Sequence, residues 1–267
     1  MLRTIQFVVI AIVLFGMSPV TKASVVDGSI FFDHFPGTAL DSGKWPAGDG
    51  FNGGGTVTVD SSLLTVATVL NTAYMVRSSS ATPLIFPVPT DWAAEALFRM
   101  TGTLQSNDGA SGQLNAHSEI ILAGNLSGDF RSRGFDLRAV QSGATNSDVF
   151  DLGWYGFDNS GTRAPLILAT GLNKDQFYTV SAHRKSDNTV DIYLNDGLIG
   201  TQPLIVANPA HLQLGDYSPS SRIAATLALD YVSVGNFVPP IIPEPSSMSL
   251  MTMAVLGLMG YARRNRK

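Results

Sequence analysis

Cysteine is absent from the 267-residue chain, and histidine is scarce, with only four residues. Without cysteine the chain can form no disulfide, no thiolate zinc site and no thiol nucleophile. The histidines lack the short spacing of metal-binding motifs; they are His34, His117, His183 and His211. Stability must therefore come from a hydrophobic core, and the sequence predicts no histidine-based metal centre.

Charged residues are also few, at 14% of the chain, and positive charge gathers at the two ends. The ends hold 6 of the 17 basic residues, which leaves residues 24–245 with 11 basic and 21 acidic residues and a net charge near −10. This acidic balance disfavours binding to nucleic acid or to an anionic membrane surface. It suits a solvated surface, a divalent cation or a neutral ligand.

The first 23 residues have the pattern of a secretory signal peptide. Arg3 precedes an apolar stretch from Phe7 to Phe15, and the small residues Thr21 and Ala23 come before Ser24. A charged start, a short apolar core and a small-residue boundary are typical of a cleaved export signal. We predict cleavage after Ala23 and export through the inner membrane by the secretion machinery.

The C-terminal end combines a Pro-Glu-Pro motif, an apolar run over residues 246–262 and a basic tail. As a helix the run would span roughly 26 Å, close to the ~30 Å hydrocarbon core of a bilayer. Cations directly after such a run are typical of a stop-transfer segment. The motif is Pro243, Glu244 and Pro245, and the cations are Arg263, Arg264, Arg266 and Lys267.

This combination resembles the PEP-CTERM sorting tail of exported proteins from exopolysaccharide-producing Gram-negative bacteria. The resemblance implies recognition by an exosortase-type sorting enzyme, transient anchoring in the membrane, and delivery to the cell surface or the extracellular matrix. We therefore divide the chain into a signal peptide 1–23, a body 24–238, a linker 239–247, a transmembrane segment 248–262 and a basic tail 263–267.

The body alternates apolar and polar residues in the manner of half-buried β-strands. No segment combines helical periodicity with capping residues. Clusters of Gly, Asn, Asp, Ser and Pro separate the candidate strands, which predicts a two-sheet antiparallel sandwich. The candidate strands are 30–35, 56–60, 63–69, 73–78, 93–101, 118–123, 135–140, 149–156, 166–169, 177–184, 189–194, 198–200, 211–215 and 224–234, and the Gly-rich residues 48–55 are predicted to be a flexible loop or an edge bulge.

A three-strand meander over residues 177–200 is the sharpest local prediction. Tyr178, Val180 and Ala182 should share one face of its first strand. The chain should reverse at residues 186–188 and again at 195–197, where Asn-Asp-Gly suits a positive backbone φ.

The opening of the body, residues 31–35 (Phe-Phe-Asp-His-Phe) with Leu40-Asp41 and Trp45, resembles that of concanavalin A-like lectin and glucanase sandwiches. The meander is similar to a laminin-G-like pattern, and residues 211–216 and 229–234 are similar to the last strands of that superfamily. The resemblance covers nearly the whole body. It implies an all-β, antiparallel two-sheet jelly roll.

The same resemblance implies a structural Ca²⁺ near the first and last strands. Asp33 and Asp230 lie on the segments that should adjoin there. Carboxylate oxygens are the hard ligands that Ca²⁺ prefers. The two aspartates are therefore the candidate metal ligands, while no other cofactor is predicted.

Glycoside hydrolases on this sandwich that resemble family 16 carry E-x-D-x-x-E or E-x-D-x-E on one strand face, which supplies the acid and the nucleophile. The sequence lacks that motif and also lacks a G-x-S-x-G elbow. Before the sorting motif the body has only Glu95 and Glu119 as glutamates, and Asp148 and Asp151 fall on opposite faces of an ideal strand. We therefore predict a non-enzymatic, lectin-like domain that binds or structures extracellular polysaccharide. A divergent polysaccharide hydrolase or lyase is one alternative, and a structural or protein-interaction module without sugar binding is the other.

Two small groups of residues are candidates for contact with polysaccharide. Trp154 and Tyr155 offer aromatic rings for the apolar face of a sugar, although both could instead fill the sandwich. Arg131 and Arg133 could bind acidic groups of an exopolysaccharide, although they could equally protect an exposed strand edge.

Overall fold

The structure is a computed structural model that describes residues 26–46, 51–52, 55–68, 74–79, 82–85, 91–106, 116–123, 135–141, 148–157, 163–203, 211–216 and 223–239. Residues 24–238 form one compact unit. The predicted signal peptide, sorting motif, transmembrane segment and basic tail all lie outside the described residues. Nowhere in the described ranges is there a helix with the length and apolar character needed to cross a membrane.

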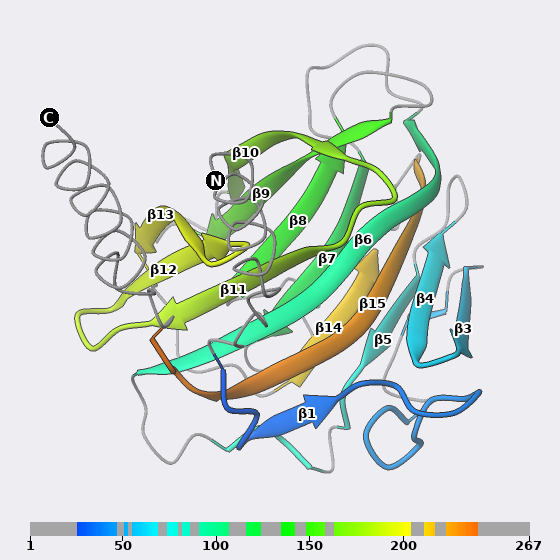
Figure 1. The fold of residues 1–267 in the computed structure, drawn as a ribbon, viewed down its shortest axis with the longest axis horizontal. Coiled ribbons are helices and arrows are strands. Elements are labelled where there is room, and N and C mark those ends of the chain that lie inside the picture. The colour runs from blue at the N-terminus through cyan, green and yellow to red at the C-terminus, as the bar shows by residue number, and fades with distance from the viewer. Residues whose placement is uncertain are drawn as a thin grey trace, which may run out of the picture. The chain divides into compact units, whose positions relative to one another are not determined.

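One sheet contains eight strands within the described ranges (Figure 1). Its strands are β1 (Phe31–Asp33), β3 (Thr56–Asp60), β4 (Leu63–Thr68), β6 (Trp92–Ser106), β11 (Tyr178–Arg184), β12 (Thr189–Leu194), β13 (Gly197–Pro203) and β15 (Ile223–Asn236). The order across the sheet is β13-β12-β11-β6-β15-β4-β3, and β1 pairs with the second half of β15. The last strand of the body therefore lies in the middle of this sheet, beside the long β6.

The other sheet has seven strands in the described part of the chain. They are β2 (Phe51–Asn52), β5 (Tyr74–Arg77), β7 (Ala116–Ala123), β8 (Phe135–Gln141), β9 (Val149–Phe157), β10 (Arg163–Asn173) and β14 (His211–Asp216). Their order is β10-β9-β8-β7-β14-β5-β2. Neighbouring strands are antiparallel in both sheets, as the sequence predicts.

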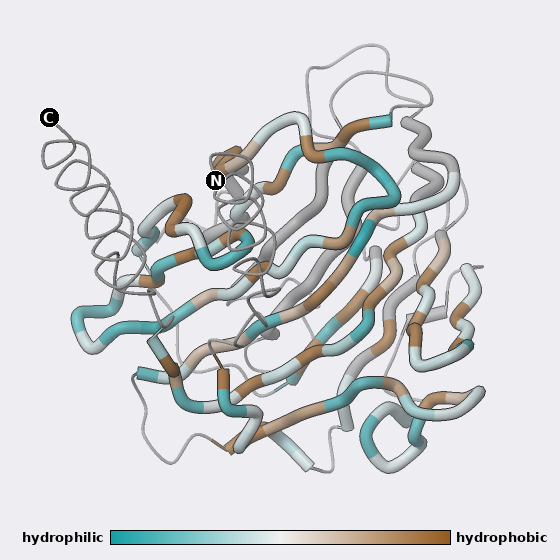
Figure 2. The backbone as a smooth tube through the Cα atoms, in the orientation of Figure 1, coloured by the Kyte–Doolittle hydropathy of each residue, from teal (hydrophilic) through white to brown (hydrophobic). Residues whose placement is uncertain are grey.

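The hydrophobic core lies between the two sheets and is built by alternate residues of their strands. The ring of Phe98 on β6 lies 6.1 Å from that of Phe150 on β9, which in turn meets Tyr178 on β11 edge-on at 5.8 Å. Leu64 and Leu214 are fully buried on either side of the same core. Figure 2 shows the alternation of apolar and polar residues along the strands that produces this layer. Because side chains alternate across a strand, each sheet keeps a second, outer face.

The predicted meander is confirmed as β11, β12 and β13, which are consecutive neighbours in the sheet. Tyr178, Val180 and Ala182 belong to the core, as predicted. Asn195 and Asp196 form the two-residue connection between β12 and β13 with φ of 48° and 67°. Two consecutive positive φ values are the signature of a type I′ hairpin turn, whose twist matches that of the strands.

Most predicted strands are present with shifted ends, and one strand was not predicted. The Gly-rich residues 48–55 contain β2, a two-residue edge strand that pairs with β5, where the sequence predicted a loop or bulge. Both β6 and β15 extend beyond their predicted ends. Their extra residues pair with each other, for example Ile223 with Ser106, and so long-range pairing sets these ends.

Candidate functional site

The outer face of the seven-stranded sheet carries a set of polar strand positions away from the core. On β14, Leu212 and Leu214 lie in the core, so His211, Gln213 and Gly215 alternate onto the outer face. Residues of β5, β7, β8 and β9 that are paired with these three positions, directly or through an intervening strand, lie on the same face. We call this surface the seven-strand outer face.

Two rows of paired positions cross this face and bring together residues that are far apart in the sequence. Each row follows cross-strand partners from β5 through β14 and β7 to β8. One row is Met75, Gly215, Glu119 and Arg138, and it continues to Gly153 on β9. The adjacent row is Arg77, Gln213, Ile121 and Asp136.

Glu119 and Asp136 occupy neighbouring strands in these two rows. Glu119 is directly opposite Arg138, and Asp136 is two residues before Arg138 on the same strand. Diagonal positions of this kind lie about 7–8 Å apart in an antiparallel pair. The register therefore brings a glutamate, an aspartate and an arginine to one small area, which the spacing in the sequence could not reveal.

Gln213 lies at the centre of the second row and has an unusual environment. Its side chain is 2% exposed although it belongs to the outer face. Within the described residues its Oε1 accepts no hydrogen bond. A buried amide oxygen without a partner costs about 1–3 kcal/mol, so such atoms in native proteins need a reason. His211, two positions along the strand, is also buried, at 3% exposed.

The predicted aromatic pair is divided between the two sides of β9. Trp154 is 3% exposed and lies in the core, beside Leu152 and Phe150. Tyr155 occupies the next position, where strand alternation leads to the outer face. Asp151 lies two positions before Gly153, and its Oδ1 accepts a hydrogen bond from Gly171 N at 3.0 Å. Of the two aromatic residues, only Tyr155 remains a candidate for contact with a sugar.

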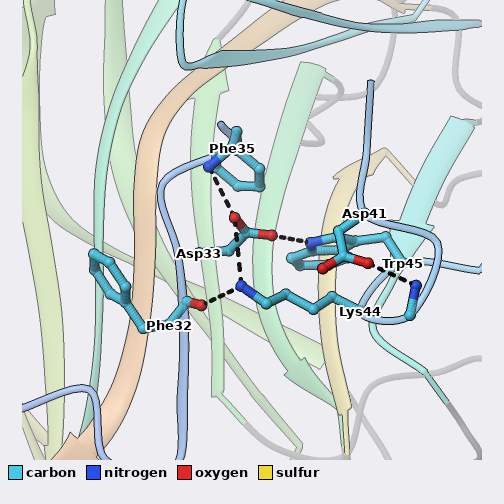
Figure 3. A network of polar contacts seen from close by, with 7 residues as sticks. Phe32, Asp33, Phe35, Asp41, Lys44 and Trp45 are labelled. Atoms are coloured by element: carbon cyan, nitrogen blue, oxygen red, sulfur yellow. Dashed lines mark hydrogen bonds and ion pairs between the residues drawn. The ribbon is translucent and has the colours of Figure 1, made fainter. Parts of the chain in front are cut away.

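Asp33, a candidate calcium ligand, lies in a buried network at the start of the body (Figure 3). It is 1% exposed, and its Oδ1 accepts a hydrogen bond from Phe35 N at 2.8 Å. Its Oδ2 accepts one from Trp45 Nε1 at 2.6 Å. Lys44 Nζ lies 3.7 Å from Oδ1 and donates to Phe32 O at 2.8 Å. Both carboxylate oxygens therefore contact donors of the chain itself.

Asp230, the other candidate calcium ligand, sits on β15, which pairs with β1 as the sequence predicted. It falls between Leu229, opposite Phe98, and Tyr231, opposite Leu97, so it is the extra residue of a β-bulge. Within the described residues no group of three or more His, Asp or Glu side chains could hold a metal ion. The calcium site stays a prediction.

Several candidate residues lie outside the described ranges. Arg131 and Arg133 fall between β7 and β8 in the chain. The sorting residues Pro243, Glu244 and Pro245 and the cations Arg263, Arg264, Arg266 and Lys267 follow the last described residue, Pro239.

A family model described as the PEP-CTERM protein-sorting motif matches residues 242–267. The predicted sorting tail is therefore confirmed, and the motif indicates export with C-terminal membrane anchoring and exosortase processing. No curated protein sequence matches the chain.

Solved structures resemble the body in fold. β-Agarase A from Zobellia galactanivorans has a TM-score of 0.53 at 12% identity, covering 84% of this chain and 98% of its own. The PL7 alginate lyase AlyA1 from the same organism has a TM-score of 0.52 at 11% identity, covering 74% and 96%. A structure from work on endo-acting O-glycanases of human gut bacteria that initiate mucin breakdown has a TM-score of 0.52 at 13% identity, covering 78% and 99%. The jelly-roll sandwich is thus confirmed, in agreement with a concanavalin A-like body.

These neighbours correct one prediction from the sequence. The missing E-x-D motif led to the prediction that the chain is not an enzyme, but the structures of like fold are polysaccharide hydrolases and lyases. The prediction was wrong because it tested for a single carboxylate motif on one strand. Folding also places residues of different strands at neighbouring positions, as the register of Glu119 and Asp136 illustrates.

Proposed function

We propose that this protein is exported and sorted to the cell surface, where its sandwich binds and cleaves extracellular polysaccharide on the seven-strand outer face. The sorting motif supports the location, and the fold it shares with polysaccharide-degrading enzymes supports the class of substrate. The observation that carries the proposal is the diagonal placement of Glu119 and Asp136 on neighbouring strands.

The two carboxylates suit glycoside hydrolysis. Hydrolysis needs one protonated carboxyl group to donate to the leaving oxygen and a second, ionised one to attack the sugar or to activate water. The carboxyl groups lie about 5–5.5 Å apart in retaining enzymes and about 6.5–9.5 Å apart in inverting ones, and diagonal strand positions allow either spacing. We assign the ionised role to Glu119, because Arg138 lies directly opposite it, and the acid to Asp136, which lies opposite the apolar Ile121.

Arg138 supports the assignment through its position directly opposite Glu119. A nearby guanidinium favours the ionised form of a carboxyl group, so it would keep Glu119 charged while the sugar is bound. Tyr155 occupies a position on the same face, where a ring could stack on a sugar.

The test is release of reducing ends from agarose, carrageenan and alginate by the purified body. Glu119→Gln and Asp136→Asn should each lower the rate about 10²–10⁴-fold, the usual contribution of a general acid or base. Asp60→Asn is the matched control, because Asp60 is an exposed carboxylate at the end of β3 in the other sheet. Activity that survives both substitutions on the seven-strand outer face would reject the site, and failure to cleave any of the polysaccharides would reject the function.

A lyase is the second candidate, favoured by Gln213 and Arg77, which are direct cross-strand partners. A guanidinium could neutralise the charge of a uronic acid carboxylate and an amide could donate a hydrogen bond to it, which would help a lyase to remove a proton from the sugar. The products separate the two candidates. Elimination leaves an unsaturated sugar that absorbs ultraviolet light, whereas hydrolysis leaves none.

A further inference from the structure

Three ring side chains gather on the opposite side of the sandwich, on the outer face of the eight-stranded sheet. The ring of Phe32 stacks near that of His34, with centroids 5.7 Å apart and planes 26° apart. It also lies 6.2 Å from the ring of Tyr231. Phe32 is 47% exposed. We call Phe32, His34 and Tyr231 the aromatic platform.

The β-bulge at Asp230 is what places Tyr231 in this group. Leu229 and Val232 both lie in the core, and two residues separate them. Regular strand alternation would place an odd number of residues between two core positions. The extra residue shifts the alternation, so Tyr231 is on the outer face beside Phe32. Bulges commonly re-aim a side chain in this way and are frequent next to functional sites.

Tyr231 is held in its orientation by a buried carboxylate. Its hydroxyl donates to Glu95 Oε1 at 2.5 Å, and Glu95 is 4% exposed. Burial raises the pKa of the Tyr231 hydroxyl, and the hydrogen bond to Glu95 raises it further, so the phenol stays protonated. A buried carboxylate is costly unless its partners compensate. A role for the ring that it fixes would explain why this carboxylate is present.

Contacts of the neighbouring backbone and side chains also hold Phe32 in place. Its backbone oxygen accepts the hydrogen bond from Lys44. The adjacent Asp33 accepts a hydrogen bond from Trp45 at 2.6 Å, and the ring centroids of Phe31 and Trp45 are 5.5 Å apart. Figure 3 shows the ring of Phe32 pointing away from this network. An exposed aromatic ring on a rigid strand loses little conformational freedom when a ligand stacks on it, which favours binding.

We propose that the aromatic platform is a second polysaccharide-binding site, specific for neutral pyranose chains. The apolar face of a neutral sugar ring can stack on Phe32, and its hydroxyl groups can bond to Tyr231 and Ser233, the residue opposite Phe32 on β15. Glu95 would repel the carboxylates or sulfates of an anionic chain. The site does not depend on the proposed cleavage, because it lies on the other sheet.

The test is migration of the body in native gels that contain agarose or alginate, which are the probes for neutral and anionic chains. Agarose should retard the wild type through the platform, whereas any retardation by alginate should be the same for the wild type and for Phe32→Ala. Phe32→Ala should weaken the retardation by agarose about tenfold, as expected for loss of one stacked ring. Leu198→Ala is the matched control, because Leu198 is a 58% exposed apolar residue on the same sheet.

Tyr231→Phe distinguishes a binding role from a structural one. It keeps the ring but removes the hydrogen bond to Glu95, so agarose binding should fall while thermal melting confirms that the body is folded. The proposal is overturned if Phe32→Ala binds agarose as well as the wild type does, or if agarose does not retard the wild type. Glu119→Gln should leave this retardation unchanged, so failure of cleavage and failure of the platform give different results.

Discussion

The two outer faces of the sandwich differ in chemistry. The seven-strand outer face gathers charged positions, with Glu119, Asp136 and Arg138 on two neighbouring strands. The outer face of the eight-stranded sheet also presents the rings of Phe32 and Tyr231, and the Tyr231 hydroxyl donates a hydrogen bond to Glu95. Proton transfer needs ionisable groups that face each other, whereas stacking needs open rings. The comparison suggests that the first face acts on a sugar chain and the second holds one.

The largest expected effect comes from a crossed pair of substitutions. Glu119→Gln should lower cleavage at least 100-fold and leave agarose retardation intact, because only a catalytic carboxylate is lost. Phe32→Ala should do the reverse, with retardation weakened about tenfold and cleavage of short soluble oligosaccharides unchanged. Rates and gel mobilities measured on the same preparations would check this. If either substitution impairs both properties without unfolding the body, the two faces are not functionally separate.

Removal of the Asp33 carboxylate should have the next largest effect, on stability. Asp33→Ala leaves the buried donors of Phe35 N and Trp45 Nε1 unpaired, which should lower the free energy of unfolding by about 2–4 kcal/mol. Urea denaturation measures the loss. Asp41→Ala is the control, because the carboxylate of the exposed Asp41 accepts a local hydrogen bond from Gly43 N in the same loop. Equal losses for both variants would contradict the role of the network in supporting Phe32.

A methyl group at Gly235 should disturb the junction of the two ends of the body. A Cβ there would lie 2.1 Å from Asp27 Oδ1 and 2.7 Å from Ser29 N. The backbone at Ser29 cannot move aside as a flexible side chain could, so Gly235→Ala should cost about 1–3 kcal/mol. Thermal melting measures the loss of stability. Gly37→Ala is a poor control, because Gly37 has a φ of 94° that a residue with a side chain rarely adopts. Gly43→Ala, in an exposed loop, is better; an effect at Gly235 no larger than at Gly43 would argue against close packing at the junction.

The smallest expected effect is a dependence of stability on acid pH through Asp27. Partial burial raises the pKa of Asp27, but hydrogen bonds from Ser29 and Asn236 outweigh it and lower the pKa to about 2. Because the folded pKa lies below the ordinary value of 3.8, the contribution is complete above about pH 4 and is lost as the pH falls towards 2. The site is exposed, so solvent screening should keep the contribution below about 1 kcal/mol. In Asp27→Asn, the free energy of unfolding should no longer show this decrease between pH 4 and 2. A pH profile of stability identical to that of the wild type would contradict the prediction.

The sequence predicted the elements of this fold much better than its functional face. Alternation located the strands, and Asn195-Asp196 identified the hairpin turn, because both signals are local. The pairing of Glu119 with Gly215 and of Arg77 with Gln213 joins segments about 100 residues apart or more. No spacing along the chain encodes such partners. The bulge at Asp230 was hidden for the same reason, since it is defined only by its pairing with β6.

The central claim is that water splits a glycosidic bond on the seven-strand outer face. Digestion of the three polysaccharides in ¹⁸O-labelled water, followed by mass spectrometry of the products, tests it most directly. We predict that one labelled oxygen enters each new reducing end with the wild type, and that Glu119→Gln yields at least 100-fold less labelled product. Unlabelled products, no products, or equal labelling by wild type and variant would contradict the claim.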